Sequence, residues 1–184
     1  MDNLKFLVKE WHPKRNYSKI FLQQEASQSL ADMLTALATL SGFDMASERL
    51  ATALDSGDQE DEHSCFSDNT HRDFIENQQG IVNVFYGSYG ASAYAFHNDT
   101  GLGIYSLLEM KNRSFAQQIA THIATTTAVI NGLPVPFDQK LIASAKNSPA
   151  RQYGELVVKA LEKQAQLLAQ AGDILGVKAE IIME

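Results

Sequence analysis

The sequence predicts an all-α fold, a helical bundle formed by a single domain over residues 1–184. The chain has four prolines and none of them lies between residues 14 and 133, so long helices are permitted there. Apolar residues also recur at steps of three, four and seven in several segments, which is the spacing of one helix face. Hydrophobic residues make up 45% of the chain, enough to bury a core.

The first strong helical pattern covers residues 26–40, and a second follows it. One face of the first carries apolar residues at helical spacing, namely Ala26, Leu30, Met33, Leu34, Leu37 and Leu40. Ser41-Gly42 predicts the end of this helix, because glycine commonly terminates helices. The same period continues in a second helix, through Ala46, Leu50, Ala53 and Leu54. Ser56-Gly57 predicts where that helix ends.

Residues 69–86 predict a third helix, because cap-type residues precede Phe74, Ile81 and Phe85 at helical spacing. Its last six residues read IVNVFY and would also suit a strand, since β-branched and aromatic residues favour sheets. We favour the helix. Residues 87–103 predict a loop, because four glycines and Asn-Asp supply turn chemistry there.

Two further helices follow. The stripe of the first is formed by Phe115, Ile119, Ile123, Thr126 and Ile130. Asn131-Gly132 predicts its end, and Pro134 prevents continuation. The last helix is predicted to begin at Ser148-Pro149, an N-cap followed by proline at the first helical position. Its apolar pairs recur every seven residues, as in helical bundles: Ala160-Leu161, Leu167-Leu168 and Ile174-Leu175.

Charge and motifs exclude several functional classes. A formal net charge of −7 argues against a nucleic-acid surface and weakly against anionic membranes, while it is compatible with binding cations. No run reaches the length of a transmembrane helix, and residues 1–12 lack the apolar core of a signal peptide. No HExxH, P-loop or GxSxG motif occurs, so the sequence lacks the usual signatures of zinc proteases, NTPases and serine hydrolases.

Residues 55–73, DSGDQEDEHSCFSDNTHRD, concentrate polar chemistry, and five of the first eight are acids. Glu60 and His63 are three residues apart, as are Asp68 and His71, so each pair would share one face of a helix. Carboxylate with imidazole suits iron or zinc, and di-metal bundle proteins use Glu-x-x-His units. The candidate metal ligands are therefore Glu60, His63, Asp68 and His71.

An alternative interpretation uses the same residues. His63 and His71 lie eight residues apart, about 12 Å along a continuous helix, so they share one ion only if the chain bends between them. Residues 67–70 are all N-cap types and would provide the bend. Equally, the acids could form a solvated loop, residues 67–70 could cap the next helix, and the histidines could bond to their neighbours. From spacing alone, this second interpretation is the favoured one.

Residues 54–90, LDSGDQEDEHSCFSDNTHRDFIENQQGIVNVFYGSYG, closely resemble the C-terminal signature of imelysin-like (peptidase M75-like) proteins. LKFLVKEWHP near the start, LTALATLSGFDMASERL in the middle and LPVPFDQKL at 133–141 are similar to that family as well. The resemblance implies a bacterial periplasmic or cell-envelope protein, built from two helical halves around a cleft and linked to iron uptake. This chain would be the C-terminal half.

The resemblance also shapes the expected site. The GxHxxE motif by which some members were classed as metallopeptidases is absent from this chain, so we expect no catalytic residues in it. The cleft-lining candidates are Glu60, Asp61, Glu62, His63, Ser64, Asp68, Asn69 and His71. The implied partner is an N-terminal imelysin half or a second copy of the chain, with iron-uptake components as further partners.

Three functional hypotheses follow. The leading one is a helical module that forms part of a ligand or metal cleft in bacterial iron uptake, with iron or another divalent cation as the ligand. The alternatives are the non-catalytic half of an M75-type metallopeptidase and a structural domain whose acidic segment docks another domain. In the leading hypothesis, residues 60–71 form a polar, partly buried junction between two helices. Both histidines should then hydrogen-bond to a carboxylate or the backbone, and Asp68 or Asn69 should cap the next helix.

Overall fold

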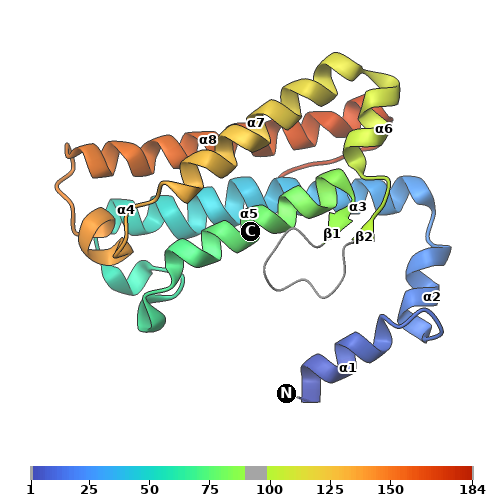
Figure 1. Cartoon of the computed structure of the whole chain (residues 1–184), viewed down its shortest axis with the longest axis horizontal. Coiled ribbons are helices and arrows are strands. Elements are labelled where there is room, and N and C mark those ends of the chain that lie inside the picture. The colour runs from blue at the N-terminus through green and yellow to red at the C-terminus, as the bar shows by residue number, and fades with distance from the viewer. Residues whose placement is uncertain (1, 90–98, 184) are drawn as a thin grey trace.

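A computed structural model describes residues 2–89 and 99–183, and it shows a bundle of long helices with a separate arm at the N-terminus (Figure 1). The all-α prediction is confirmed. Four helical rods run side by side: residues 26–56, α5 (Thr70–Tyr86), α7 (Arg113–Asn131) and α8 (Pro149–Leu175). Beyond the helices, the described residues pair only β1 (Ser88–Tyr89) with β2 (Asp99–Thr100), antiparallel, with Ser88 opposite Thr100.

The first rod is one continuous helix made of α3 (Ala26–Thr39), the π-helical η1 (Leu40–Ala51) and α4 (Thr52–Ser56). The predicted helix end at Ser41-Gly42 is therefore wrong. A Cβ on Gly42 would lie 2.7 Å from the Cβ of Ala165 in α8, and the Ser41 hydroxyl donates to the Leu161 carbonyl oxygen at 2.8 Å. These small residues let two helices approach closely instead of ending one.

The other helix ends agree better with the sequence. Gly57 ends the first rod in the left-handed region at φ 68°, where glycine avoids the strain of a side chain. α5 is helical through Tyr86, which confirms the helical interpretation of residues 81–86. α7 ends at Asn131, as predicted. α8 begins at Pro149, and the Ser148 hydroxyl accepts a hydrogen bond of 3.1 Å from the Arg151 amide.

The predicted loop at 87–103 is described only in part, because residues 90–98 lie outside the described residues. It leads into α6 (Ile104–Lys111), a short helix that the sequence pattern did not reveal. Between α7 and α8, the short π-turn η4 (Asp138–Ile142) packs against α4 and α8. The Phe137 ring before it stacks on Phe74 of α5, with ring centroids 6.2 Å apart.

A polar pair lies inside the apolar core. Gln78 of α5 and Gln164 of α8 are 1% and 0% exposed, and each side-chain amide donates to the other's oxygen, at 3.0 and 2.9 Å. Gln164 also donates to the Ser41 hydroxyl at 3.0 Å, and Gln78 donates to the Thr127 hydroxyl at 3.1 Å. Because buried amides need partners, this network fixes how the first rod, α5, α7 and α8 align.

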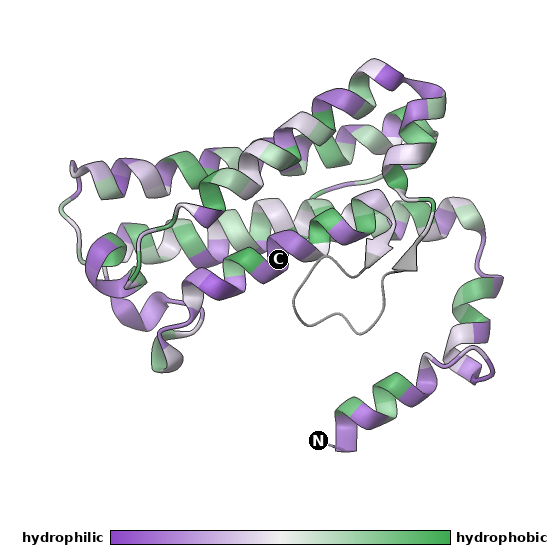
Figure 2. Ribbon diagram, viewed as in Figure 1, coloured by the Kyte–Doolittle hydropathy of each residue, from purple (hydrophilic) through white to green (hydrophobic). Residues whose placement is uncertain are grey.

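The arm consists of α1 (Asp2–Glu10) and α2 (Asn16–Gln23), which the sequence pattern did not reveal either. It leaves the bundle at the start of α3 and contributes no buried residue from α1 (Figure 1). Trp11 packs edge-on against Tyr17 and Phe21, with centroids 4.8 and 5.3 Å apart, and so holds the bend between the helices. Figure 2 shows hydrophobic residues on the outside of both helices.

No helix in the described ranges combines the length and the apolar character needed to cross a membrane.

Candidate functional site

The candidate segment, residues 58–73, joins α4 to the start of α5 at the end of the bundle opposite the arm (Figure 1). It contains two short 3-10 turns, η2 (Gln59–Asp61) and η3 (Cys65–Ser67). The Asp58 carboxylate accepts a hydrogen bond of 3.0 Å from the Glu60 amide, which starts the first turn. Asp68 ends the second in the left-handed region at φ 50°, a conformation that aspartate tolerates better than most residues.

Glu62 is the buried carboxyl of this segment, with 6% of its surface exposed. Its Oε2 accepts a hydrogen bond of 3.1 Å from the Thr70 hydroxyl, which itself accepts one of 3.2 Å from the Ser64 amide. Its Oε1 is buried and has no partner among the described residues. Burial raises the pKa of the Glu62 carboxyl; the Thr70 hydrogen bond opposes that rise, and the charges of Asp138 and Asp68 add to it.

The start of α5 is tied to this segment through Ser64. The Ser64 hydroxyl donates a short hydrogen bond to the Asp73 carboxylate. Asp73 lies in the first turn of α5, where a negative charge favours the helix N-terminus. Thr70 and Asp73 therefore hold the loop that carries Glu62 against the helix.

The two candidate histidines are placed differently from the sequence expectation. His63 is exposed and His71 is half-buried, and within the described residues neither has a hydrogen-bond partner. The bond that was expected from each histidine to a carboxylate or backbone group is thus not found among the described residues. The Nδ1 atom of His71 is nevertheless buried, so this part of the chain holds two unpartnered buried polar atoms, Glu62 Oε1 and His71 Nδ1.

The expected cap is confirmed in its position, because Asn69 is the N-cap residue of α5, but not in its side-chain hydrogen bond. α5 begins at Thr70, yet the Asn69 side chain makes no capping hydrogen bond, and the Asp68 carboxylate accepts from the Gln59 amide at 3.3 Å. The Asn69 carbonyl oxygen accepts from the backbone amides of Arg72 and Asp73 instead, at 2.8 and 3.1 Å. The first turn of α5 therefore starts on backbone hydrogen bonds alone, without the side-chain acceptor that was expected.

The eight cleft candidates divide into two groups. Glu62 is buried, and Ser64 and His71 are half-buried, so these three form the partly buried junction. The other five are exposed: Glu60, Asp61, His63, Asp68 and Asn69. Within residues 2–88 and 101–183, no three His, Cys, Asp or Glu side chains come together as a metal site, so the four proposed ligands are not assembled into one there.

Sequence reasoning missed two residues of this site. Thr70 was treated only as a capping type, although its hydroxyl is buried and bonded to Glu62. Asp138 of η4, which helps to raise the pKa of Glu62, comes from the family-like LPVPFDQKL stretch, the one signal that could have pointed to it. Beside the segment, a groove of about 310 Å³ between α4 and α8 contains Asp55, 3.7 Å from the buried guanidinium of Arg151.

Two buried polar atoms of this arrangement have hydrogen-bonding capacity that no described residue satisfies. A carboxyl oxygen and an imidazole nitrogen, both buried and unpartnered, can accept hydrogen bonds from a ligand or coordinate a cation. Because its pKa is raised, the Glu62 carboxyl holds its proton more firmly than an exposed glutamate would, so a cation that binds there must displace that proton.

No curated protein sequence matches the chain significantly. The family model of imelysin, peptidase M75, matches residues 1–168. This match covers most of the chain, including both helices of the arm and the whole candidate segment. The chain belongs to the imelysin family.

Proposed function

We propose that this chain is the C-terminal, ligand-binding half of an imelysin-type protein that acts in bacterial iron uptake in the periplasm or cell envelope. Residues 58–73 form one wall of its binding cleft, and a GxHxxE-bearing imelysin half forms the other. The observation that carries the proposal is the Oε1 atom of Glu62, which is buried at the end of the bundle and has no partner among the described residues.

Energetics support a ligand at this position. A buried polar atom without a hydrogen bond costs about 1–3 kcal/mol, and a charged one costs more. Such a cost is relieved when a second surface brings a donor or a cation to Glu62 Oε1 and to His71 Nδ1. The exposed acids Glu60, Asp61 and Asp68 around them make the wall electronegative, which favours a cationic ligand.

Iron or another divalent cation fits these groups in part. Carboxylate and imidazole are ligands that iron accepts, and Glu62 and His71 supply one of each. Two ligands hold such an ion weakly, so the missing ones must come from the other half. The isolated chain is therefore expected to be a poor metal binder, and to have no peptidase activity of its own.

A structural role would use the same two atoms differently. In that case, hydrogen-bond donors of a docking domain would satisfy Glu62 and His71, and no metal would be involved. The measurement that separates the two functions is metal affinity in the presence of the second half.

The test is equilibrium dialysis of Fe²⁺, under anaerobic conditions, and of Zn²⁺ against the full chain alone and mixed with a GxHxxE-bearing imelysin half. We expect the mixture to bind at least tenfold more tightly than either half. Glu62→Gln should remove most of that gain, whereas the exposed carboxylate change Glu155→Gln should not. A complex that forms without binding either ion would contradict the metal role and favour the docking role.

A further inference from the structure

Charge is distributed very unevenly along this chain. Residues 1–24 carry five cations, Lys5, Lys9, Lys14, Arg15 and Lys19, against the two acids Asp2 and Glu10, a formal charge of +3. Because the whole chain carries −7, the remaining residues carry −10. The arm is therefore basic and the bundle is strongly acidic, and the two carry complementary charge.

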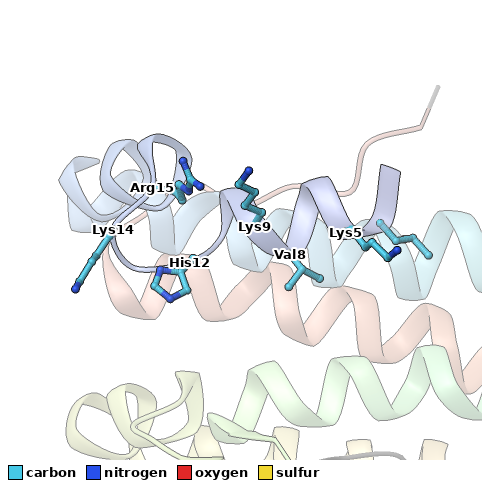
Figure 3. Close-up of a pocket in the computed structure, with 7 residues that line it drawn as sticks. Lys5, Val8, Lys9, His12, Lys14 and Arg15 are labelled. Atoms are coloured by element: carbon cyan, nitrogen blue, oxygen red, sulfur yellow. The ribbon is translucent and has the colours of Figure 1, made fainter. Parts of the chain in front are cut away.

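The basic arm contains an apolar groove. This groove, of about 710 Å³, is lined by the apolar Leu4 and Val8 and by Lys5, Lys9, His12, Lys14 and Arg15. Figure 3 shows Val8 with the five basic or imidazole side chains from α1 and the turn after it. Leu4 and Val8 are 68% and 74% exposed, so the bundle of the same molecule does not cover them. Among the surrounding cations, the described residues give a carboxylate partner only to Lys5, which lies 3.7 Å from Asp2.

The opposite end of the bundle carries an exposed aromatic side chain among acids. Phe66, in the turn η3, is 98% exposed, more than any other large hydrophobic residue in the described part of the chain. Exposed acids of the same segment, Asp58, Glu60, Asp61 and Asp68, accompany it. We call residues 58–68 the acidic tip. An exposed aromatic ring accompanied by acids has the chemistry that an apolar groove with a cationic rim would recognise.

We propose that the arm of one molecule docks on the acidic tip of a second copy, with Phe66 seated in the groove between Leu4 and Val8. Lys5, Lys9, Lys14 and Arg15 then face the acids of the partner's tip. Two such contacts, related by a two-fold axis, join a pair of molecules, and each molecule gives one arm and receives one. The dimer requires no ligand at Glu62, but residues 58–68 also belong to the proposed cleft wall, so the arm and a GxHxxE-bearing half would compete for this surface.

The arm cannot reach the tip of its own molecule while it stays helical. At about 1.5 Å per residue, α1 and α2 together span roughly 26 Å, whereas the rod from Ala26 to Ser56 that separates the arm from the tip spans roughly 40 Å or more. Figure 1 shows the arm joined to one end of that rod, at the start of α3, and the tip at the other end, after α4. A second copy supplies the tip without bending either helix.

A membrane surface is the other macromolecular class that a basic, amphipathic helix can bind. The bundle opposes it, because its charge of −10 is repelled by an anionic bilayer. A membrane would also leave Phe66 and its accompanying acids unexplained, whereas a second copy uses both surfaces.

The experiment measures the mass of the full chain in solution by sedimentation equilibrium. We expect a dimer at low salt whose dissociation constant rises at least tenfold between about 50 and 500 mM NaCl, because exposed charge pairs are screened. Val8→Ser and Phe66→Ser should each weaken the dimer at least tenfold. Leu156→Ser on α8, where the residue is 50% exposed, is the matched control and should leave it unchanged.

Charge reversal tests which surfaces pair. Lys5→Glu with Lys9→Glu changes the formal charge of the arm from +3 to −1, and Glu60→Lys with Asp61→Lys and Asp68→Lys changes that of the tip from −5 to +1. Each reversed chain should be monomeric alone, because its arm and tip then carry like charge. A mixture of the two should form a heterodimer, since each arm meets an oppositely charged tip. All these positions are exposed, so circular dichroism should show an unchanged helix content.

Three results would overturn the proposal. The first is a wild-type chain that stays monomeric at about 200 μM and low salt. The second is a dimer that Phe66→Ser and tip reversal leave intact. The third is a chain that remains monomeric yet floats with vesicles of anionic phospholipid and is released by arm reversal, which would assign the arm to membranes.

Discussion

The Thr70 hydroxyl lies 3.1 Å from Oε2 of Glu62, and both side chains are buried where the candidate segment meets α5. This bond satisfies one oxygen of a carboxyl whose other oxygen has no partner among the described residues. The site is therefore half-satisfied within this chain. Its energetics can be tested without knowing the ligand.

Glu62 should make stability depend on pH. Burial raises its folded-state pKa above the ordinary value of 4.5, so over a window that begins near pH 4.5 the folded chain keeps a proton that the unfolded chain has lost. Stability conferred by that proton is present below the window and is lost as pH rises through the folded pKa. Urea unfolding between pH 4 and 8 should show that the unfolding free energy of Glu62→Gln increases relative to that of the wild type as pH rises.

Glu155→Gln changes an exposed carboxyl of α8 and provides the control for this series. The difference in unfolding free energy between Glu155→Gln and the wild type should stay constant across the same pH range. If the difference for Glu62→Gln also stayed constant, the Glu62 carboxyl would not be titrating in a buried environment.

Removing the Thr70 hydroxyl should be costly, whereas shortening the side chain should not. Thr70→Val keeps the shape but leaves Oε2 of Glu62 and the Ser64 amide without their partner, so we expect a loss of about 1–3 kcal/mol in unfolding free energy. Thr70→Ser keeps the hydroxyl and should lose about 1 kcal/mol or less for one methyl group. Equal losses in the two variants, measured by urea denaturation, would show that the hydrogen bonds do not matter.

Two glycines should respond in opposite ways to alanine. A Cβ on Gly103 would lie 2.5 Å from the Phe85 carbonyl oxygen and closer still to backbone atoms of Tyr86 and Gly87. Backbone cannot move aside easily, so Gly103→Ala should destabilise the fold by about 1–3 kcal/mol. Gly80, within α5, has nothing within 4 Å of such a Cβ, and Gly80→Ala should stabilise by about 0.5–1 kcal/mol. Thermal unfolding of both variants checks this contrast.

The buried glutamine pair should behave as one unit. Gln164→Met removes the donor to Gln78 Oε1 and should destabilise by about 1–3 kcal/mol, because a buried amide group is left unpaired. Gln78→Met removes the donor to Gln164 Oε1 and should destabilise the fold to a similar extent. The double variant replaces both amides by apolar groups of similar shape, so its loss should be well below the sum of the two. Strict additivity in denaturant unfolding would contradict the coupling.

The sequence by itself determined the class of the fold and most of the bundle. Helix face periodicity is a local property, so the positions of α5, α7 and α8 followed from their own apolar spacing. The helix starts and stops at Gly57, Asn131 and Pro149 were also local, since turn and cap residues act within a few positions. The family could be recognised from residues 54–90, because a long signature is itself a sequence property.

Contacts between distant segments decided what the sequence could not. Ser41-Gly42 has the composition of a helix end, but its proximity to Ala165 and Leu161 of α8 makes it a packing site. The arm was missed because its helices are short and their apolar residues face outward. At Ser41-Gly42 and in the arm, the local sequence is compatible with more than one backbone conformation, and contacts with distant residues select among them.

For the candidate site too, some properties could be predicted from the sequence and others only from the structure. Its location and its residue types could be predicted, since acids and histidines gather in one stretch of sequence. The sequence alone could not show that Glu62 is buried while its neighbours Asp61 and His63 are exposed. Burial depends on where the chain folds back against α5 and on the Thr70 hydroxyl eight residues away. Charge and hydrogen-bonding capacity are fixed by the sequence, but the surroundings that set their energy exist only once the bundle has formed.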